Sequence, residues 1–489
     1  MNKKNYVAVA TLAFAMLTSC AGQKEAKSTS GIDLANMDTT VSAGTDFFRY
    51  ACGGWNDAHP LTAEYSRYGT FDELFENSQK QLRELIEGLA AQKNNQAGSA
   101  AQKIGDLYNM AMDSVTLNKQ GAEPVKAMLD KIAGLKDKSE IVPMMTEMAH
   151  IGIGTYFHSY VYADPKNSSL NIFQMGQGGI NLGEKEYYLD TDSITQNIRE
   201  QYKLYIGKLF QLAGFSEADA QQKVADVMEI ETAIAKVSRS ATELRDPEAN
   251  YHKMSFDELK KTIAGIDWDA YMKGLGIQAP AELNVEQVEP IQEVARLMNT
   301  LPLSKHVSYL EYNLLDAAAS CLSDDFVAAR FDFYGKVLSG RQVNQPRWKR
   351  AVNSVNGMLG ELVGEMYVEK YFPAAAKERM VKLVKNLQTA LGERIDAQEW
   401  MSDSTKIRAH EKLAAFHVKV GYPDKWKDYS KLEIKNDSYW ANVCRASEWG
   451  FNDMYSRIGK PVDKDEWLMT PQTVNAYYNP STNEICFPA

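Results

Sequence analysis

Cysteine is scarce in this sequence, and its five cysteines are widely separated among 489 residues. Cys52, Cys321, Cys444 and Cys486 have neither the density of a small disulfide scaffold nor the spacing of zinc-binding cysteines. The fifth, Cys20, ends a short apolar run at the N-terminus. A chain of this length is long enough for two or three domains and a sizeable hydrophobic core. We therefore expect a globular protein that is not organised around disulfides.

Positive charge is also lacking. The 54 lysines and arginines are outnumbered by 64 aspartates and glutamates, which gives a formal net charge of -10. No stripe of lysine or arginine compensates, so the sequence argues against a nucleic-acid-binding protein. Hydrophobic residues make up 44% and charged residues 24%, which is ordinary for a soluble globular protein. Solubility accounts for the acidity.

Apolar runs long enough to span a membrane are absent as well. The N-terminal run Val7–Leu17 is too short to cross a bilayer. It follows two lysines and ends at Leu-Thr-Ser-Cys20, which is typical of a signal peptide over residues 1–20 and resembles a bacterial lipobox. We expect lipid attachment at Cys20, a tether and extended segment over residues 21–45, and a lipid-anchored protein of the bacterial cell envelope, periplasmic or surface-exposed. A plain secretory signal with an incidental cysteine is the alternative.

Most of the chain between residues 46 and 429 carries apolar residues at helical spacing. The pattern predicts one long helix that begins at Arg347 and further helices near residues 100–114, 124–133, 141–151, 192–214, 216–238, 375–398 and 403–418. Alternating segments at 155–163 and 170–175 flank a turn and predict one β-hairpin. The predicted fold class is therefore mainly α, a large helical domain with a small β-hairpin insertion.

The last residues of the chain predict a second hairpin. Thr473–Tyr478 is rich in β-branched and aromatic residues, Asn479–Thr482 has turn chemistry, and Glu484–Phe487 forms the return strand. A hairpin alone is marginally stable in water. We expect this hairpin to need a partner that the chain itself does not supply.

Several segments resemble a known family. Val474-Asn-Ala-Tyr-Tyr-Asn-Pro, followed by Phe487-Pro-Ala, closely resembles the strand before the zinc-binding helix in the neprilysin and endothelin-converting-enzyme family of metallopeptidases. Tyr50-Ala-Cys-Gly-Gly-Trp55 and Arg347-Trp348 resemble earlier family segments in the same order. The resemblance extends from about Thr45 to the last residue. It implies a zinc-dependent metalloendopeptidase that cleaves small peptides on the amino side of apolar residues.

The resemblance also implies a division of the chain. Residues 46–429 would form the helical N-terminal domain of the peptidase, which limits the access of peptides in this family. Residues 430–489 would form the incomplete start of an α+β, thermolysin-like catalytic domain. The boundary is expected near Tyr429, where the helical pattern gives way to the segment that carries the final hairpin.

Other features that the resemblance implies fall beyond Ala489. The family binds Zn2+ through a His-Glu-x-x-His helix, and the nearest imitation here, His410-Glu-Lys-Leu-Ala, lacks the second histidine. His417 follows seven residues after His410, which is too far for the two to share a metal without another ligand. We therefore predict no catalytic residue and no zinc ligand within this chain, and a fragment that is inactive and poorly stable alone. The family's disulfide partner for Cys52 would also lie beyond Ala489.

Five residues match the substrate-binding positions of the family. Asn475 and Ala476 correspond to the Asn-Ala pair that holds a peptide added to the sheet edge, although a purely structural edge strand is the alternative. Arg67 matches an arginine that grips the C-terminal carboxylate of short peptides, a role that suits its planar fork. Phe71 would line an apolar pocket or belong to the core, and Asp72 would lie beside Arg67.

Two other functions remain open at this point. One is a non-catalytic, peptide-binding or glycan-binding lipoprotein of the bacterial outer membrane. The glycan-binding class would be expected to show helical repeats and exposed aromatic platforms, and the Asn475 and Arg67 segments argue against it. The other is a truncated family member retained as a peptide-binding pseudo-enzyme.

Overall fold

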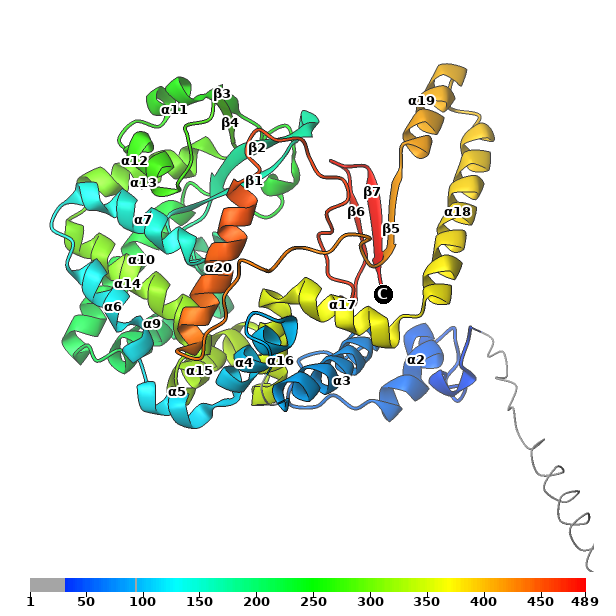
Figure 1. The fold of residues 1–489 in the computed structure, drawn as a ribbon, viewed down its shortest axis with the longest axis horizontal. Coiled ribbons are helices and arrows are strands. Elements are labelled where there is room, and N and C mark those ends of the chain that lie inside the picture. The colour runs from blue at the N-terminus through cyan, green and yellow to red at the C-terminus, as the bar shows by residue number, and fades with distance from the viewer. Residues whose placement is uncertain (1–30, 93–94) are drawn as a thin grey trace, which may run out of the picture. The chain divides into compact units, whose positions relative to one another are not determined.

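A computed structural model describes residues 31–92 and 95–489 (Figure 1). The predicted signal peptide and its Cys20 lie outside these residues, so lipid attachment stays a prediction. None of the helices in the described ranges has the length and apolarity needed to cross a membrane. The chain divides into two compact units after Thr62.

The first unit contains a short 3-10 helix, η1 (Leu34–Asn36), and helix α2 (Phe47–Ala58). Arg49 of α2 forms two ion pairs within this unit: its Nε lies 2.8 Å from Asp38 Oδ2 and its Nη2 lies 2.6 Å from Asp57 Oδ2. Cys52 on the same helix is a free thiol. The pairs are partly exposed to solvent, so each contributes little stability.

The second unit is mainly helical, which confirms the predicted fold class. Most of its large buried side chains form one continuous core. Its α-helices are α3 (Thr70–Ala90), α4 (Ala100–Met112), α5 (Ser114–Gln120), α6 (Glu123–Ala133), α7 (Ile141–His150), α8 (Glu186–Leu189), α9 (Ser193–Leu212), α10 (Glu217–Ala235), α11 (Phe256–Thr262), α12 (Trp268–Gly274), α13 (Val288–Thr300), α14 (Leu303–Ala318), α15 (Asp324–Arg330), α16 (Arg347–Met358), α17 (Gly360–Tyr371), α18 (Ala374–Asp396), α19 (Asp403–Ala414) and α20 (Tyr439–Tyr455). Shorter helical turns are η2 (Lys138–Glu140), η3 (Glu243–Arg245) and η4 (Ala319–Cys321), and η5 (Phe331–Leu338) is a π-helix.

The predicted inner hairpin exists but belongs to a larger sheet. Strands β1 (Phe157–Asp164) and β2 (Asn167–Gln177) pair antiparallel, and β4 (Glu282–Val285) and β3 (Lys253–Ser255) extend the sheet in the order β1-β2-β4-β3. The two added strands have three and four residues. Such short segments show too few alternations for the sequence to reveal them.

The final hairpin has a partner within the chain, so the expectation of an unpaired hairpin was wrong. Strand β5 (His417–Gly421) pairs parallel with β7 (Glu484–Pro488), and β6 (Tyr477–Asn479) pairs antiparallel with β7 on its other side (Figure 1). The helix predicted to reach residue 418 ends at Ala414 instead. His417 therefore lies on a strand, because pairing with β7 outweighs the local helical pattern.

The long helix predicted from Arg347 is broken in two. Helix α16 ends at Met358 and α17 begins at Gly360, with Leu359 at φ -120° between them. The loop that leads to β6 approaches closely here: Gln472 Nε2 donates to the Gly360 carbonyl at 2.8 Å, and a Cβ on Gly360 would lie 2.6 Å from Thr470 Cγ2. A side chain at residue 360 would therefore have to displace Thr470 of this loop.

A fully buried carboxyl group lies in the helical core of the second unit. Glu231 of α10 accepts hydrogen bonds from the Tyr188 hydroxyl at 2.7 Å, from the Tyr202 hydroxyl at 2.9 Å and from Asn181 Nδ2 at 2.7 Å. Burial outweighs these donors and raises the pKa of Glu231 to about 7. The folded protein therefore keeps a proton on this group over a pH range in which the unfolded chain has lost it.

Because Glu231 has this raised pKa, we expect the free energy of unfolding to fall as the pH rises from about 4.5 to about 7. Below that window Glu231 is protonated in both states, and within it only the folded state holds the proton. The expected loss is about 3 kcal/mol. Glu231→Gln should flatten this part of the pH profile, measured by urea unfolding at several pH values. An unchanged slope in the variant would assign the pH dependence to other groups.

Candidate peptide-binding edge and the adjoining cavity

Asn475 and Ala476 are both exposed and lie just before β6. In the sheet order β5-β7-β6, β7 is central and β6 is an edge strand. The register pairs Tyr477 with Cys486 and Asn479 with Glu484. The outer side of β6 and the two residues that precede it thus form an accessible edge. Such an edge is the kind to which an extended peptide adds as a further strand.

The side chain of Asn475 is partly engaged within the chain. Its Oδ1 accepts the Ala476 N–H at 2.8 Å, and its own backbone N–H donates to the Thr473 carbonyl at 2.9 Å. Its Nδ2 has no hydrogen-bond partner among the described residues. The amide nitrogen is therefore available as a donor, whereas sequence reasoning offered both the donor and the acceptor to a ligand.

A buried ion pair supports this edge from within the sheet. Lys419 Nζ on β5 lies 2.8 Å from Glu484 Oε2 on β7, and the two side chains are only 3% and 2% exposed. Lys419 Nζ also donates to the Glu466 carbonyl, and the Tyr477 hydroxyl of β6 donates to Glu484 Oε1 at 2.8 Å. One lysine and one glutamate thus join all three strands to the loop beside them.

The other predicted residues lie at the start of α3. Phe71 is 69% exposed, so it does not belong to the core. The Asp72 carboxylate accepts the Gly69 N–H at 2.9 Å and so caps the helix N-terminus, a role that sequence reasoning did not give it. Arg67 is exposed in the segment that leads into the helix.

A lysine from another helix fixes the chain on both sides of Arg67. Lys349 Nζ of α16 lies 2.8 Å from Glu64 Oε2 and also pairs with Glu76 of α3. The Tyr65 hydroxyl donates to the same Glu76 carboxylate. Lys349 is buried, so its two carboxylate partners hold the segment before α3 against the helix. The sequence alone does not reveal this cluster, because Lys349 is far from the other members in the chain.

One contact joins the helix that follows Arg67 to the loop that precedes Asn475. The Ser78 hydroxyl of α3 donates to the Gln472 carbonyl at 3.2 Å, and both residues are buried. Ser78 lies about two helical turns after Phe71, and Gln472 lies three residues before Asn475. The structure therefore packs α3 against the loop that leads to the edge strand.

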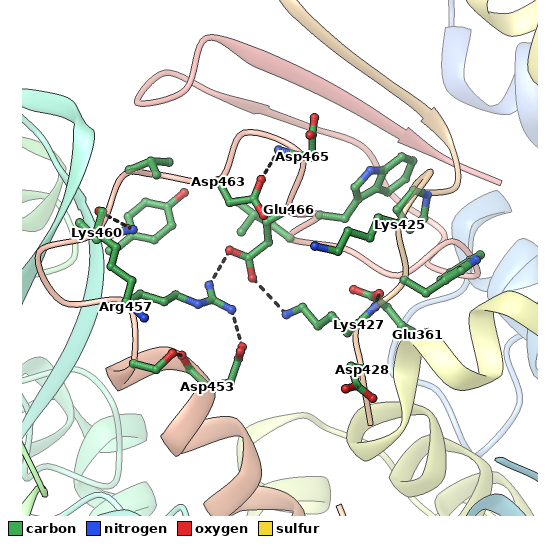
Figure 2. Close-up of a pocket in the computed structure, with 18 of the residues that line it drawn as sticks. Glu361, Lys425, Lys427, Asp428, Asp453, Arg457, Lys460, Asp463, Asp465 and Glu466 are labelled. Atoms are coloured by element: carbon green, nitrogen blue, oxygen red, sulfur yellow. Dashed lines mark hydrogen bonds and ion pairs between the residues drawn. The ribbon is translucent and has the colours of Figure 1, made fainter. Parts of the chain in front are cut away.

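A cavity of about 630 Å³ lies beside the sheet (Figure 2). A chain of charges crosses it: Lys427 Nζ lies 3.0 Å from Glu466 Oε1, Glu466 also pairs with Arg457, and Arg457 pairs with Asp453. The backbone N–H of Lys427 donates to Glu361 Oε2 at 2.7 Å. These pairs join the end of α20 to two loops.

The five residues matched to substrate binding are not among those that line this cavity. It meets the sheet instead at Asn479 and Glu484. Asn479 Nδ2 donates to the Tyr162 hydroxyl of β1 at 2.7 Å, which connects the edge strand to the other sheet. The cavity is thus a neighbour of the candidate edge and not the edge itself.

The histidines singled out in the sequence are separated in the structure. His410 Nε2 on α19 lies 2.7 Å from Asp396 Oδ1, whereas His417 lies on β5. Within residues 31–92 and 95–489, no group of three or more His, Cys, Asp or Glu side chains is arranged to hold a metal ion. The residues described here therefore do not fit a zinc centre by themselves.

The fold is similar to that of bacterial zinc metalloproteases. It superposes on zinc metalloprotease Zmp1 of Mycobacterium tuberculosis in complex with an inhibitor, with a TM-score of 0.88, 35% identity and coverage of 94% of this chain and 69% of that one. The open state of Zmp1 gives a TM-score of 0.80 at 35% identity, covering 91% and 69% of the two chains.

The sequence comparisons identify the family. The profile of Peptidase family M13 matches residues 43–423. Endothelin-converting enzyme 1 of Rattus norvegicus is 30% identical over 481 residues, which cover 93% of this chain and 62% of that protein. The chain belongs to Peptidase family M13, the neprilysin and endothelin-converting-enzyme family of zinc metallopeptidases. It spans about three fifths of the length of the curated relatives that it matches.

Proposed function

We propose that this chain is the substrate-positioning part of a zinc-dependent endopeptidase that cleaves small peptides on the amino side of apolar residues. The observation that carries the proposal is the exposed Asn475–Ala476 segment at the edge of a sheet, in a chain of Peptidase family M13. A peptide bound there would lie as a fourth strand beside β6. Asn475 Nδ2 would donate to its backbone, and the small Ala476 would allow the close approach.

The zinc ligands and the catalytic base belong, in this proposal, to a His-Glu-x-x-His segment outside residues 1–489. The described residues bind and orient the peptide, and no step of hydrolysis is assigned to them. By themselves they are proposed to be inactive. A domain boundary near Tyr429 remains part of the proposal. Strand β5 precedes this boundary in the sequence, although it belongs to the final sheet.

Arg67 and Phe71 are proposed to recognise two different parts of the peptide substrate. Both side chains are exposed at the N-terminal end of α3, which packs on the loop before Asn475. The Arg67 guanidinium would bind the terminal carboxylate of a short peptide, and the Phe71 ring would contact an apolar side chain. Asp72 is assigned to capping α3 and so to holding Arg67 and Phe71 in place.

We expect Arg67→Gln to remove a preference for peptides with a free C-terminal carboxylate. The native protein should cleave a short peptide with a free C-terminal carboxylate with a kcat/KM about tenfold above that for the same peptide amidated at its C-terminus. The amidated peptide cannot form the guanidinium–carboxylate pair with Arg67. The variant should cleave the two peptides equally well, and Arg67→Lys should restore part of the preference. An acid-to-amide ratio that is unchanged in Arg67→Gln would remove Arg67 from the site.

The N-terminal sequence supports anchoring of the protein to the bacterial cell envelope through a lipid on Cys20. The basic residues, the short apolar run and the Leu-Thr-Ser-Cys ending carry this part of the proposal. Fractionation of cells that express Cys20→Ser tests it. The variant should leave the membrane fraction, and retention there would argue against the lipid.

The proposed activity is tested with an internally quenched peptide that contains one apolar residue among polar ones. The native protein, purified from its own cells, should cut immediately before the apolar residue, and mass spectrometry identifies the new N-terminus. Binding of the peptide without cleavage would instead support a peptide-binding protein. Absence of both binding and cleavage would contradict the proposal.

A further inference from the structure

A second cavity, of about 280 Å³, is lined by four arginines. Arg330 ends α15, Arg341 follows the π-helix η5, and Arg347 and Arg350 lie in the first turns of α16. This cavity shares no lining residue with the cavity beside the sheet. None of the five residues matched to substrate binding lines it either, so it is a different place from the candidate edge.

Only part of this positive charge is neutralised by the protein. Arg330 Nη1 lies 2.8 Å from Asp316 Oδ1, and Arg347 pairs with Asp324. Arg350 donates to the Gln345 carbonyl at 3.0 Å, which carries no net charge. Within the described part of the chain, neither Arg341 nor Arg350 has a carboxylate partner. Two of the four guanidinium groups thus lack an ion-pair partner in this part of the chain, although the charge of Asp324 still acts on Arg350.

One donor in this cluster lacks any acceptor. Arg341 Nε is shielded from solvent and has no hydrogen-bond partner among the described residues. Buried donors in folded proteins are rarely left unpaired, because the desolvation cost is not recovered. The unpaired Nε shows that the protein itself does not fully satisfy the Arg341 guanidinium.

The arginines also crowd one another. Burial and the nearby charge of Arg347 together lower the pKa of the Arg350 guanidinium. Like charges held at a partly buried site repel one another more strongly than they do in water. An anion in the cavity would relieve the repulsion.

The wall that holds these side chains is an uncommon structure. Residues Phe331–Leu338 form a π-helix, a rare geometry that is frequent at functional sites. Its rings lie under two of the guanidinium groups: Arg330 Cζ is 4.4 Å from the Tyr334 centroid, and Arg341 Cζ is 5.6 Å from the Phe331 centroid. The Arg341 N–H donates to the Gly335 carbonyl at 3.0 Å, which fixes the backbone at Arg341.

We propose that this cavity binds a small tetrahedral oxyanion of the phosphate class. Guanidinium forks match the oxygen geometry of phosphate, and two arginines without an ion-pair partner favour an anion. The Ser354 and Tyr439 hydroxyls, 2.5 Å apart at the cavity wall, supply neutral hydrogen-bonding groups. The volume is small for a nucleotide or a peptide and suits inorganic phosphate or a single phosphoryl group.

The test uses inorganic phosphate and the full chain of 489 residues. Isothermal titration at constant ionic strength, with chloride as the balancing salt, should give saturable binding at one site per chain. Arg341→Gln and Arg350→Gln should each weaken phosphate binding by at least about tenfold. Arg379→Gln is the matched control, because Arg379 is exposed on α18 and does not line the cavity.

Thermal unfolding without phosphate shows whether the variants fold. Arg350→Gln should melt at or above the temperature of the parent protein, because a repelling charge is removed, but phosphate should raise its melting temperature less. Arg341→Lys keeps the charge and loses the planar fork, so it should bind with intermediate affinity. Absence of saturable binding, or equal affinity in Arg341→Gln, Arg350→Gln and Arg379→Gln, would overturn the proposal.

Discussion

Replacing Lys419 with methionine is expected to lower the free energy of unfolding by about 3–5 kcal/mol. The lysine and its partner Glu484 are almost completely buried, so the substitution leaves a carboxylate in the sheet without its counter-charge. The Tyr477 hydroxyl would be its remaining side-chain donor there. Urea unfolding of the chain at neutral pH measures the loss directly.

A matched control separates burial from the mere loss of an ion pair. Lys126 Nζ lies 2.8 Å from Asp130 Oδ2, the same distance as in the buried pair, but its side chain is 57% exposed. Lys126→Met should cost under about 1 kcal/mol. The double variant Lys419→Met with Glu484→Leu should recover much of the stability, because no buried charge is left unpaired. Equal losses for Lys419→Met and Lys126→Met would contradict the structural role given to the buried pair.

Asn475→Ala is expected to lower kcat/KM for peptide cleavage by about tenfold to a hundredfold. The proposed edge strand offers the Asn475 amide to the backbone of the bound peptide, and alanine cannot replace that donor. Asn475 is exposed, so the melting temperature should stay unchanged. Steady-state kinetics of the native protein with an internally quenched peptide give the ratio.

Asn436 supplies the control for this prediction. It is another exposed asparagine, and it lies outside the hairpin, so Asn436→Ala should leave kcat/KM as it is. A loss in Asn475→Ala that came with a lower melting temperature would indicate a structural edge strand. An unchanged kcat/KM in Asn475→Ala would exclude the proposed contact with the peptide.

The sequence predicts the helices well because their apolar spacing is a local property. It misses β5, since the pattern before Gly421 continues a helical stretch and only the partner β7, more than sixty residues later, makes it a strand. It also merges α16 with α17, because the loop that approaches Gly360 comes from the far end of the chain. Both errors arise where a distant segment decides the local structure.

The residues of the candidate site also fall into those that the sequence reveals and those that it does not. Asn475, Ala476, Arg67 and Phe71 could be found because they lie in short segments that resemble the family, and all four are exposed in the structure. Lys419 could not be found, since its partner Glu484 is remote in sequence and its own segment looked helical. Exposed residues in segments that resemble the family can be found from the sequence, whereas the buried residues that support them depend on the fold.

The most direct test of the account is the zinc dependence of peptide cleavage by the native protein. Dialysis against 1,10-phenanthroline should abolish cleavage of the quenched peptide, and one equivalent of zinc should restore it, with the new N-terminus at the apolar residue. The same treatment should leave the melting temperature of residues 1–489 alone unchanged. Cleavage that persists in the zinc-free protein, or a zinc-loaded protein that binds the peptide and never cuts it, would contradict the proposed peptidase.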